Sequence, residues 1–241
     1  ANVLAVELDP TTAAISQYLY PHAHHMNNAF QNTHLSSPAF DLVIGNPPFG
    51  SQSLYDPDSP ELRGFSIHNY FLAKSLKLLR DGGIGAFVVS RFFMDATDPT
   101  VREHISEYAD LLGAIRLPET AFRQIALTDV TTDILFFRRH TGNSIRSKDW
   151  VSTETIDVED VKEGGMKPAT VNRYFALTGD RQIIGKLAFS GGMFRDALNC
   201  IAEPGVDLAK EIEQRLAVLP PEEYKPRITI EENTVQAATQ N

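Results

Sequence analysis

The sequence is poor in cysteine, with a single residue of this type, Cys200, in a chain of 241 residues. One cysteine excludes an internal disulfide and is a poor start for a zinc site, so we expect a buried thiol. Long apolar runs are also missing: no stretch reaches the roughly 18 apolar residues that a membrane span needs. With no charged-then-apolar leader either, the sequence predicts a cytoplasmic protein without a membrane span.

Basic charge is scarce as well. The 22 Lys and Arg residues stand against 31 Asp and Glu residues, which gives a formal net charge of −9. Because clustered Lys and Arg drive non-specific binding to phosphates, this charge balance argues against nucleic-acid binding by the chain alone. The one notable basic cluster is Arg138, Arg139, Arg146 and Lys148, for which a phosphate contact and a solvated strand end both stay open.

Two other groups of polar residues are interpreted as structural. His22, His24 and His25 lie close together, but no carboxylate or thiolate lies at ligand spacing, so we expect a solvated loop and no metal site. Asp133 follows two threonines and is expected at a strand entry or turn rather than as an acid catalyst.

Apolar runs typical of strands alternate with helical periodicity as far as His140. Strands are predicted over 2–7, 41–45, 84–90, 111–117 and 132–138, and helices over about 12–20, 71–79 and 100–108. Gly82-Gly83 is expected to end the second of these helices. This alternation predicts an α/β sheet that is mainly parallel. No helix separates the last two strands, so they are expected to form an antiparallel edge pair.

After His140 the periodicity weakens. A possible short strand within 149–158 and an amphipathic helix over 208–219 are the elements predicted there. We therefore divide the chain into a core domain at 1–140 and an irregular C-terminal extension at 141–241.

The tetrapeptide Asn46-Pro47-Pro48-Phe49 follows a predicted buried strand. The amino group of adenine is a poor nucleophile, because its lone pair is delocalised into the ring. Two acceptors on its hydrogens, the Asn46 side-chain oxygen and a backbone carbonyl, would weaken that conjugation and direct the lone pair at an electrophilic methyl group. The prolines hold these carbonyls in place, and Phe49 offers a face on which an extruded base can stack.

The alternative for this tetrapeptide is a rigid turn without chemistry. Its place at the end of a buried strand, where open α/β sheets bind ligands, favours the functional interpretation. Glu7 occupies a similar place at the end of the first strand, where a carboxylate can accept both ribose hydroxyls of a nucleoside-type cofactor.

With these residues the chain resembles a class I S-adenosylmethionine-dependent N6-adenine DNA methyltransferase, and more narrowly the methyltransferase domain of phage and plasmid methylase-helicase proteins. The resemblance spans about residues 2–140. It rests on the segments VELDP (6–10), AFQNT (29–33), FDLVIGNPPFG (40–50), HNYFLAKSL (68–76), GGIGAFVVS (82–90), IRLP (115–118) and TDVTTDILF (128–136). Residues 171–175 and 185–187 resemble the segment after the methylase core in that family.

The resemblance implies a Rossmann-like sheet, S-adenosylmethionine as cofactor and DNA as partner, within a larger methylase-helicase assembly. It implies catalytic roles for Asn46, Pro47, Pro48 and Phe49, with the target amino group held by Asn46 and the Pro47 carbonyl. It places Glu7, Leu8, Gln31 and Asn46 at the cofactor. Gln31 stands where the family commonly has an acid beside the cofactor adenine.

The family also places a strand and a glycine-rich loop before the ribose acid, and here six residues precede Glu7. That strand lies at the centre of the family's sheet, between the strands that carry Glu7 and Asn46. We therefore expect a fragment of a longer enzyme, a gap filled by another segment, or a degenerate domain. Three functions stay open: adenine methylation in DNA, a non-catalytic module for assembly or DNA protection, and methylation of RNA or protein glutamine.

Overall fold

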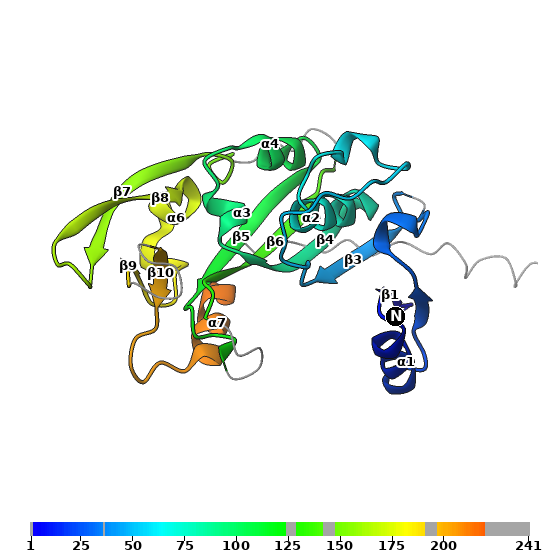
Figure 1. Cartoon of the computed structure of the whole chain (residues 1–241), viewed down its shortest axis with the longest axis horizontal. Coiled ribbons are helices and arrows are strands. Elements are labelled where there is room, and N and C mark those ends of the chain that lie inside the picture. Colours follow the sequence, from blue (N-terminus) through cyan, green and yellow to red (C-terminus); the bar gives the residue numbers. More distant parts are fainter. Residues whose placement is uncertain (1, 36, 124–128, 142–147, 191–196, 220–241) are drawn as a thin grey trace, which may run out of the picture.

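The computed structural model describes residues 2–35, 37–123, 129–141, 148–190 and 197–219. It is a mixed α/β structure, which confirms the predicted class at that level. Its strands form three sheets, with a four-stranded main sheet in the middle, a small two-stranded unit at one end and a second four-stranded sheet at the other (Figure 1).

The main sheet has the strand order β3-β4-β6-β5. Its strands are β3 (Phe40–Gly45), β4 (Leu79–Ser90), β6 (Thr132–Arg139) and β5 (Ala109–Leu117). The predicted antiparallel pair β5–β6 is present. The prediction of a mainly parallel sheet was wrong for the described part of the main sheet, where β3–β4 is the parallel pair. The reason is that β6 inserts between β4 and β5 and runs antiparallel to both.

Helices cover both faces of the main sheet. On one face lie α2 (Ile67–Leu78) and α4 (Thr100–Ser106), preceded by the short helix α3 (Phe92–Asp95). On the other face, α7 (Leu208–Ala217) packs Leu208 and Ile212 near Ile115 and Leu117 of β5. The predicted helix stop was wrong, because α2 ends at Leu78 and the glycine pair lies inside β4. Gly83 is required there, since a Cβ atom would come within 2.9 Å of the Arg80 carbonyl oxygen.

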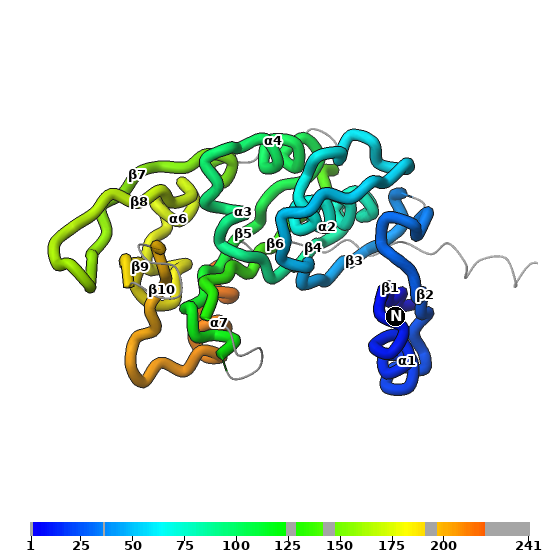
Figure 2. The backbone as a smooth tube through the Cα atoms, viewed as in Figure 1, coloured from blue at the N-terminus to red at the C-terminus, as the bar shows by residue number. Residues whose placement is uncertain are grey.

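The N-terminal unit consists of β1 (Leu4–Glu7), α1 (Pro10–Leu19) and β2 (His24–Asn27). The two strands pair in parallel, with Glu7 opposite Asn27. Asp9 caps α1 by accepting a hydrogen bond from the Thr12 amide, as the Asp-Pro-Thr sequence predicts. This unit lies beside the β3 end of the main sheet (Figures 1 and 2). Two of the histidines expected in a loop, His24 and His25, lie on β2.

The C-terminal part is more regular than predicted. The second four-stranded sheet has the order β10-β9-β7-β8, and α6 (Arg173–Thr178) follows its β8 strand. Its strands are β7 (Thr153–Asp160), β8 (Met166–Asn172), β9 (Lys186–Phe189) and β10 (Leu198–Ile201). The sequence predicted an irregular extension here because each strand has two to three apolar residues, which give little periodicity, and β9 and β10 have four residues each.

One large apolar core runs through both parts of the chain. It contains Phe87 of β4 and Leu76 of the covering helix α2. It also contains Trp150, Phe175 and Cys200 from the C-terminal part. The Cys200 thiol is fully buried, as predicted, and burial raises its pKa to about 12. Within the described ranges, no helix is both long and apolar enough to cross a membrane.

Candidate active site

The candidate site lies at the carboxyl edge of the parallel strands β3 and β4. The register pairs Gly45 with Phe87, so Asn46 leaves the sheet beside the last residues of β4. In open α/β sheets this edge is where ligands bind. The structure therefore places the Asn-Pro-Pro-Phe tetrapeptide at the expected edge.

The four residues of the tetrapeptide differ in burial. Pro47 is buried and fixes the backbone, whereas Asn46 and Pro48 are exposed. Phe49 has 51% of its surface exposed, which is unusual for a phenylalanine and leaves a ring face open to a ligand. Immediately after it, Gly50 packs tightly, since a Cβ atom there would come within 3.0 Å of Ile67 Cγ2.

His68 contacts the Phe49 ring. It lies in the first turn of α2, is 7% exposed, and meets Phe49 edge-on at a ring-centroid distance of 5.5 Å. The Phe93 ring of α3 lies 6.5 Å from His68. Burial lowers the pKa of His68 below its ordinary value, which favours the neutral imidazole. Phe49 is thus held by an aromatic row that spans both strand ends.

The predicted cofactor residues lie on the N-terminal unit and the turn after it. Glu7 ends β1, and its Oε1 atom accepts a hydrogen bond of 2.9 Å from the Asp9 amide. Asn27 fixes this end of the strand, because its side-chain amide donates to the carbonyl oxygens of Glu7 and Leu8, at 2.9 Å each. The Leu8 side chain is exposed, and Gln31 lies half-buried in the 3-10 helix Phe30–Asn32.

The predicted site residues are therefore divided between two sheets. Glu7 ends a strand of the two-stranded unit, and Asn46 follows the edge strand of the main sheet. Among the described residues, no strand pairs with β3 on the side away from β4, or with β1 on the side away from β2. Strand pairing therefore does not connect the predicted cofactor residue Glu7 to the predicted catalytic residue Asn46.

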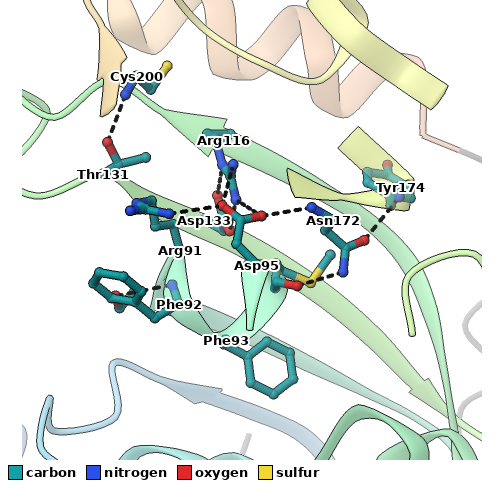
Figure 3. Close-up of polar contacts among 12 residues, drawn as sticks. Arg91, Phe92, Phe93, Asp95, Arg116, Thr131, Asp133, Asn172, Tyr174 and Cys200 are labelled. Carbon is teal, nitrogen blue, oxygen red and sulfur yellow. Dashed lines mark hydrogen bonds and ion pairs between the residues drawn. The ribbon is translucent and has the colours of Figure 1, made fainter. Parts of the chain in front are cut away.

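A buried charged network lies at the same edge of the main sheet, under the ends of β4 and β5 (Figure 3). Arg116 is completely buried and donates to both carboxylate oxygens of Asp133, at 2.8 and 3.0 Å, and to Asp95 at 3.0 Å. Burial alone would lower the pKa of Arg116, but the two carboxylates outweigh it and raise that pKa. Asp133 is thus a structural partner of Arg116, consistent with the non-catalytic interpretation from its sequence.

Three features were not predicted from the sequence: His68, the Arg116 network, and a buried pair between Lys74 and Asp56. His68 and Lys74 stood inside the segment HNYFLAKSL that carried the resemblance, so a signal was present. Nothing in the sequence paired Arg116 with Asp95 or Lys74 with Asp56, because those partners are 21 and 18 residues apart.

Other candidate sites are less well supported. In the described part of the chain, no group of three or more His, Cys, Asp or Glu side chains is placed to hold a metal ion. A cavity of about 300 Å³ lies beyond the end of β5. It is lined by Pro118, Thr120, Ala121, Ile184, Ala202, Glu203, Val206 and Leu208, none of which is a predicted site residue.

Comparison with known proteins agrees with this class of site. The model of the Eco57I restriction-modification methylase family matches residues 6–120, just under half of the chain. The matched segment contains Glu7, Gln31 and the tetrapeptide from Asn46 to Phe49. The match confirms the predicted resemblance to a methyltransferase family over this segment. No curated protein sequence matches the chain.

Solved structures similar to the chain include three methyltransferases or modification subunits. A protein described as a class I S-adenosylmethionine-dependent methyltransferase, from Listeria monocytogenes, is 23% identical with a TM-score of 0.49, over 61% of this chain and 47% of that one. A type I restriction enzyme modification subunit from Vibrio vulnificus YJ016 is 19% identical with a TM-score of 0.49, over 68% and 36%. The EcoKI M protein is 16% identical with a TM-score of 0.47, over 89% and 57%. The chain therefore spans less than two thirds of the length of each.

Proposed function

We propose that this chain is the catalytic part of an S-adenosylmethionine-dependent methyltransferase that modifies the N6 amino group of adenine in DNA. The observation that carries the proposal is the tetrapeptide Asn46-Pro47-Pro48-Phe49 at the carboxyl end of β3, with Asn46 and the Phe49 ring exposed. The match of residues 6–120 to a restriction-modification methylase family supports it.

The protein's part in this reaction is to hold the target base. The Asn46 side-chain oxygen and the Pro47 carbonyl would accept hydrogen bonds from the amino group, and Phe49 would stack on the extruded ring. Glu7 has the chemistry to hold the ribose of the cofactor, because its carboxylate ends a parallel strand at the sheet edge. When bound, S-adenosylmethionine supplies the electrophilic methyl group.

We further propose that one parallel strand completes the sheet between β1 and β3. Both strands have an unpaired edge among the described residues. Apolar side chains are also exposed on β3 and on the helix α1 that follows β1. On β3, Ile44 is 73% exposed and Leu42 51%; on α1, Tyr18 is 86% exposed, and Ile15 and Leu19 are each exposed by more than half. Apolar surface at an open edge is typical of a place where another segment packs. A glycine-rich loop after that strand would complete the cofactor site.

Calorimetry with S-adenosylmethionine tests both proposals. We expect weak or no binding by this chain and micromolar binding by a form extended at its N-terminus with a strand and a glycine-rich loop. Micromolar binding by the chain alone would contradict the need for an added strand.

Asn46→Ala tests the role of the tetrapeptide. In the cofactor-binding form we expect this change to lower the rate of DNA methylation by about 100-fold or more, because one of two acceptors on the amino group is lost. Cofactor affinity and the free energy of unfolding should stay near those of the unaltered protein, since Asn46 is exposed. Ser51→Ala serves as a control at an exposed residue outside the tetrapeptide. Full methylation by Asn46→Ala would disprove the assigned role.

A non-catalytic module for assembly or DNA protection is the second candidate. It is favoured by the edges of β1 and β3 that no strand of the described part of the chain pairs with. In that case a partner chain occupies the gap. Stable association with a partner, together with no cofactor binding even in the extended form, would support this candidate over the enzyme.

The substrate class is tested by its products. Mass spectrometry of DNA, RNA and peptides incubated with the cofactor-binding form should find N6-methyladenine in DNA. Methylated RNA or methylated glutamine, without methylated DNA, would show that the same site acts on another substrate. A larger methylase-helicase assembly that works on DNA in the cytoplasm is the setting that we propose for this domain.

A further inference from the structure

A buried ion pair lies behind the candidate site, between helix α2 and the loop that follows the tetrapeptide. The Lys74 ammonium donates to Asp56 Oδ2 at 2.8 Å, and these side chains are 5% and 1% exposed. Tyr70 also donates to Asp56 Oδ2, at 2.6 Å. Burial alone would raise the pKa of Asp56, but the hydrogen bonds from Lys74 and Tyr70 outweigh it and hold that pKa below its ordinary value.

The same ammonium also holds the segment that carries Gln31. Lys74 donates to the Phe30 carbonyl oxygen at 2.9 Å, and it lies 4.8 Å from the centroid of the Phe30 ring. The Phe30 ring packs in turn on Phe71 and Tyr70 of α2. One buried cation therefore bonds both the Phe30–Asn32 helix and the loop at Asp56.

A second link joins the same two segments at the surface. His34 Nδ1 lies 2.5 Å from Asp58 Oδ2, and the Asp58 amide donates to Asp56 Oδ1 at 2.9 Å. The loop is also fastened to α2, because the Ile67 amide donates to the Gln52 carbonyl oxygen at 2.6 Å. The loop after Phe49 is thus anchored at Gln52 and again at Asp56.

We propose that Lys74 and Asp56 are positioning residues that set the cofactor-side segment around Gln31 against the target-side loop after Phe49. The inference rests on the proposed function, since it assigns the two segments to cofactor and base. Neither side chain touches the reacting atoms. A fixed spacing between the two segments aligns the bound base with the methyl donor, and a misplacement of about 1 Å can cost about 100-fold in rate.

The double variant Lys74→Met/Asp56→Leu separates positioning from folding. Each single change leaves a buried charge without its partner and is expected to destabilise the fold, whereas the double change replaces both charges with apolar groups of similar size. Tyr70→Phe is the matched control, because it removes a hydrogen bond from the same carboxylate and leaves both bonds of Lys74 in place.

Hydrogen exchange on the chain as it stands is the first readout. In the double variant we expect at least tenfold faster exchange at amides of both 28–34 and 52–58, with unchanged exchange in β4 and no such change in Tyr70→Phe. Faster exchange in neither segment, or in one alone, overturns the proposal. This readout needs no cofactor, so it remains informative if the proposed function fails.

Kinetics on the cofactor-binding form is the second readout. We expect the double variant to remain folded and to lose at least tenfold in kcat and tenfold in cofactor affinity, while Tyr70→Phe keeps both. Unaltered kcat and affinity in a folded double variant overturn the proposal. Failure of the unaltered extended protein to bind cofactor would instead overturn the proposed function.

Discussion

At the scale of single residues, the site is built from side chains whose neighbours hold them in one state. Phe49 offers an exposed ring, and His68 beneath it is buried and favours the neutral form. Asn46 and Phe49 were predictable from the sequence because their chemistry and their spacing are local. His68 was not, because its role depends on burial between two rings that come from different strand ends.

The titration of His68 gives a stability prediction. Its pKa in the folded protein is lowered from the ordinary value of 6.5, so the unfolded chain takes up the proton more readily. The unfolded state therefore gains a proton first as the pH falls, and the free energy of unfolding should decrease below about pH 6.5.

The matched comparison for this prediction is His68→Phe, which keeps an aromatic ring between Phe49 and Phe93. Urea unfolding between about pH 5 and pH 8 should show the unaltered protein losing stability relative to the variant as the pH decreases. A constant difference between the two proteins across that range would show that His68 does not titrate in this way.

At the scale of helices and strands, local periodicity located β1, β3, β4, β5 and β6 to within a few residues. It failed for the strands of the second sheet and for the start of β4, which begins at Leu79 although the glycine pair was expected to stop α2. In both cases the deciding contacts are tertiary: strand pairing in the first, and the close approach of Gly83 to the Phe40 and Asp41 carbonyl groups of β3 in the second. The insertion of β6 between β4 and β5 likewise has no local signal.

The glycine directly before β9 lies against the backbone of β10. Gly185 has a φ of +110°, and a Cβ atom there would overlap the carbonyl oxygen of Ile201. We expect Gly185→Ala to lower the free energy of unfolding by about 2 to 4 kcal/mol, through backbone strain and displacement of β10. Gly205→Ala is the control, because Gly205 has a φ of +77° with open space around it. Equal costs at the two positions in urea unfolding would refute the overlap.

At the scale of the whole molecule, the second sheet is attached to the main sheet and its helices by buried hydrogen bonds. Asn172, at the end of β8, is completely buried and donates to the carbonyl oxygens of Met94 and Trp150, at 2.7 and 2.8 Å. The backbone amide of Asn172 donates to Oδ1 of Asp95, a member of the charged network, at 2.9 Å. The predicted division at residue 140 therefore cuts through a continuous core.

Asn172→Ala tests this attachment. It leaves two buried carbonyl groups without their donors, and we expect it to cost about 2 to 4 kcal/mol in the free energy of unfolding. Because the core is shared, fluorescence of Trp150 and far-ultraviolet circular dichroism should still report one transition, at a lower urea concentration. Two separate transitions in the unaltered protein would show instead that the second sheet folds independently.

Within the described ranges, β1 and β3 each have one edge without a pairing strand, and this has a practical consequence for handling the protein. An open strand edge beside exposed apolar side chains is a template for pairing with another molecule. Purified at high concentration, this chain should self-associate, and a lysine in place of Ile44 on β3 should keep it monomeric in analytical ultracentrifugation. The same open edges would make yield and solubility depend on co-expression with whatever segment closes the sheet.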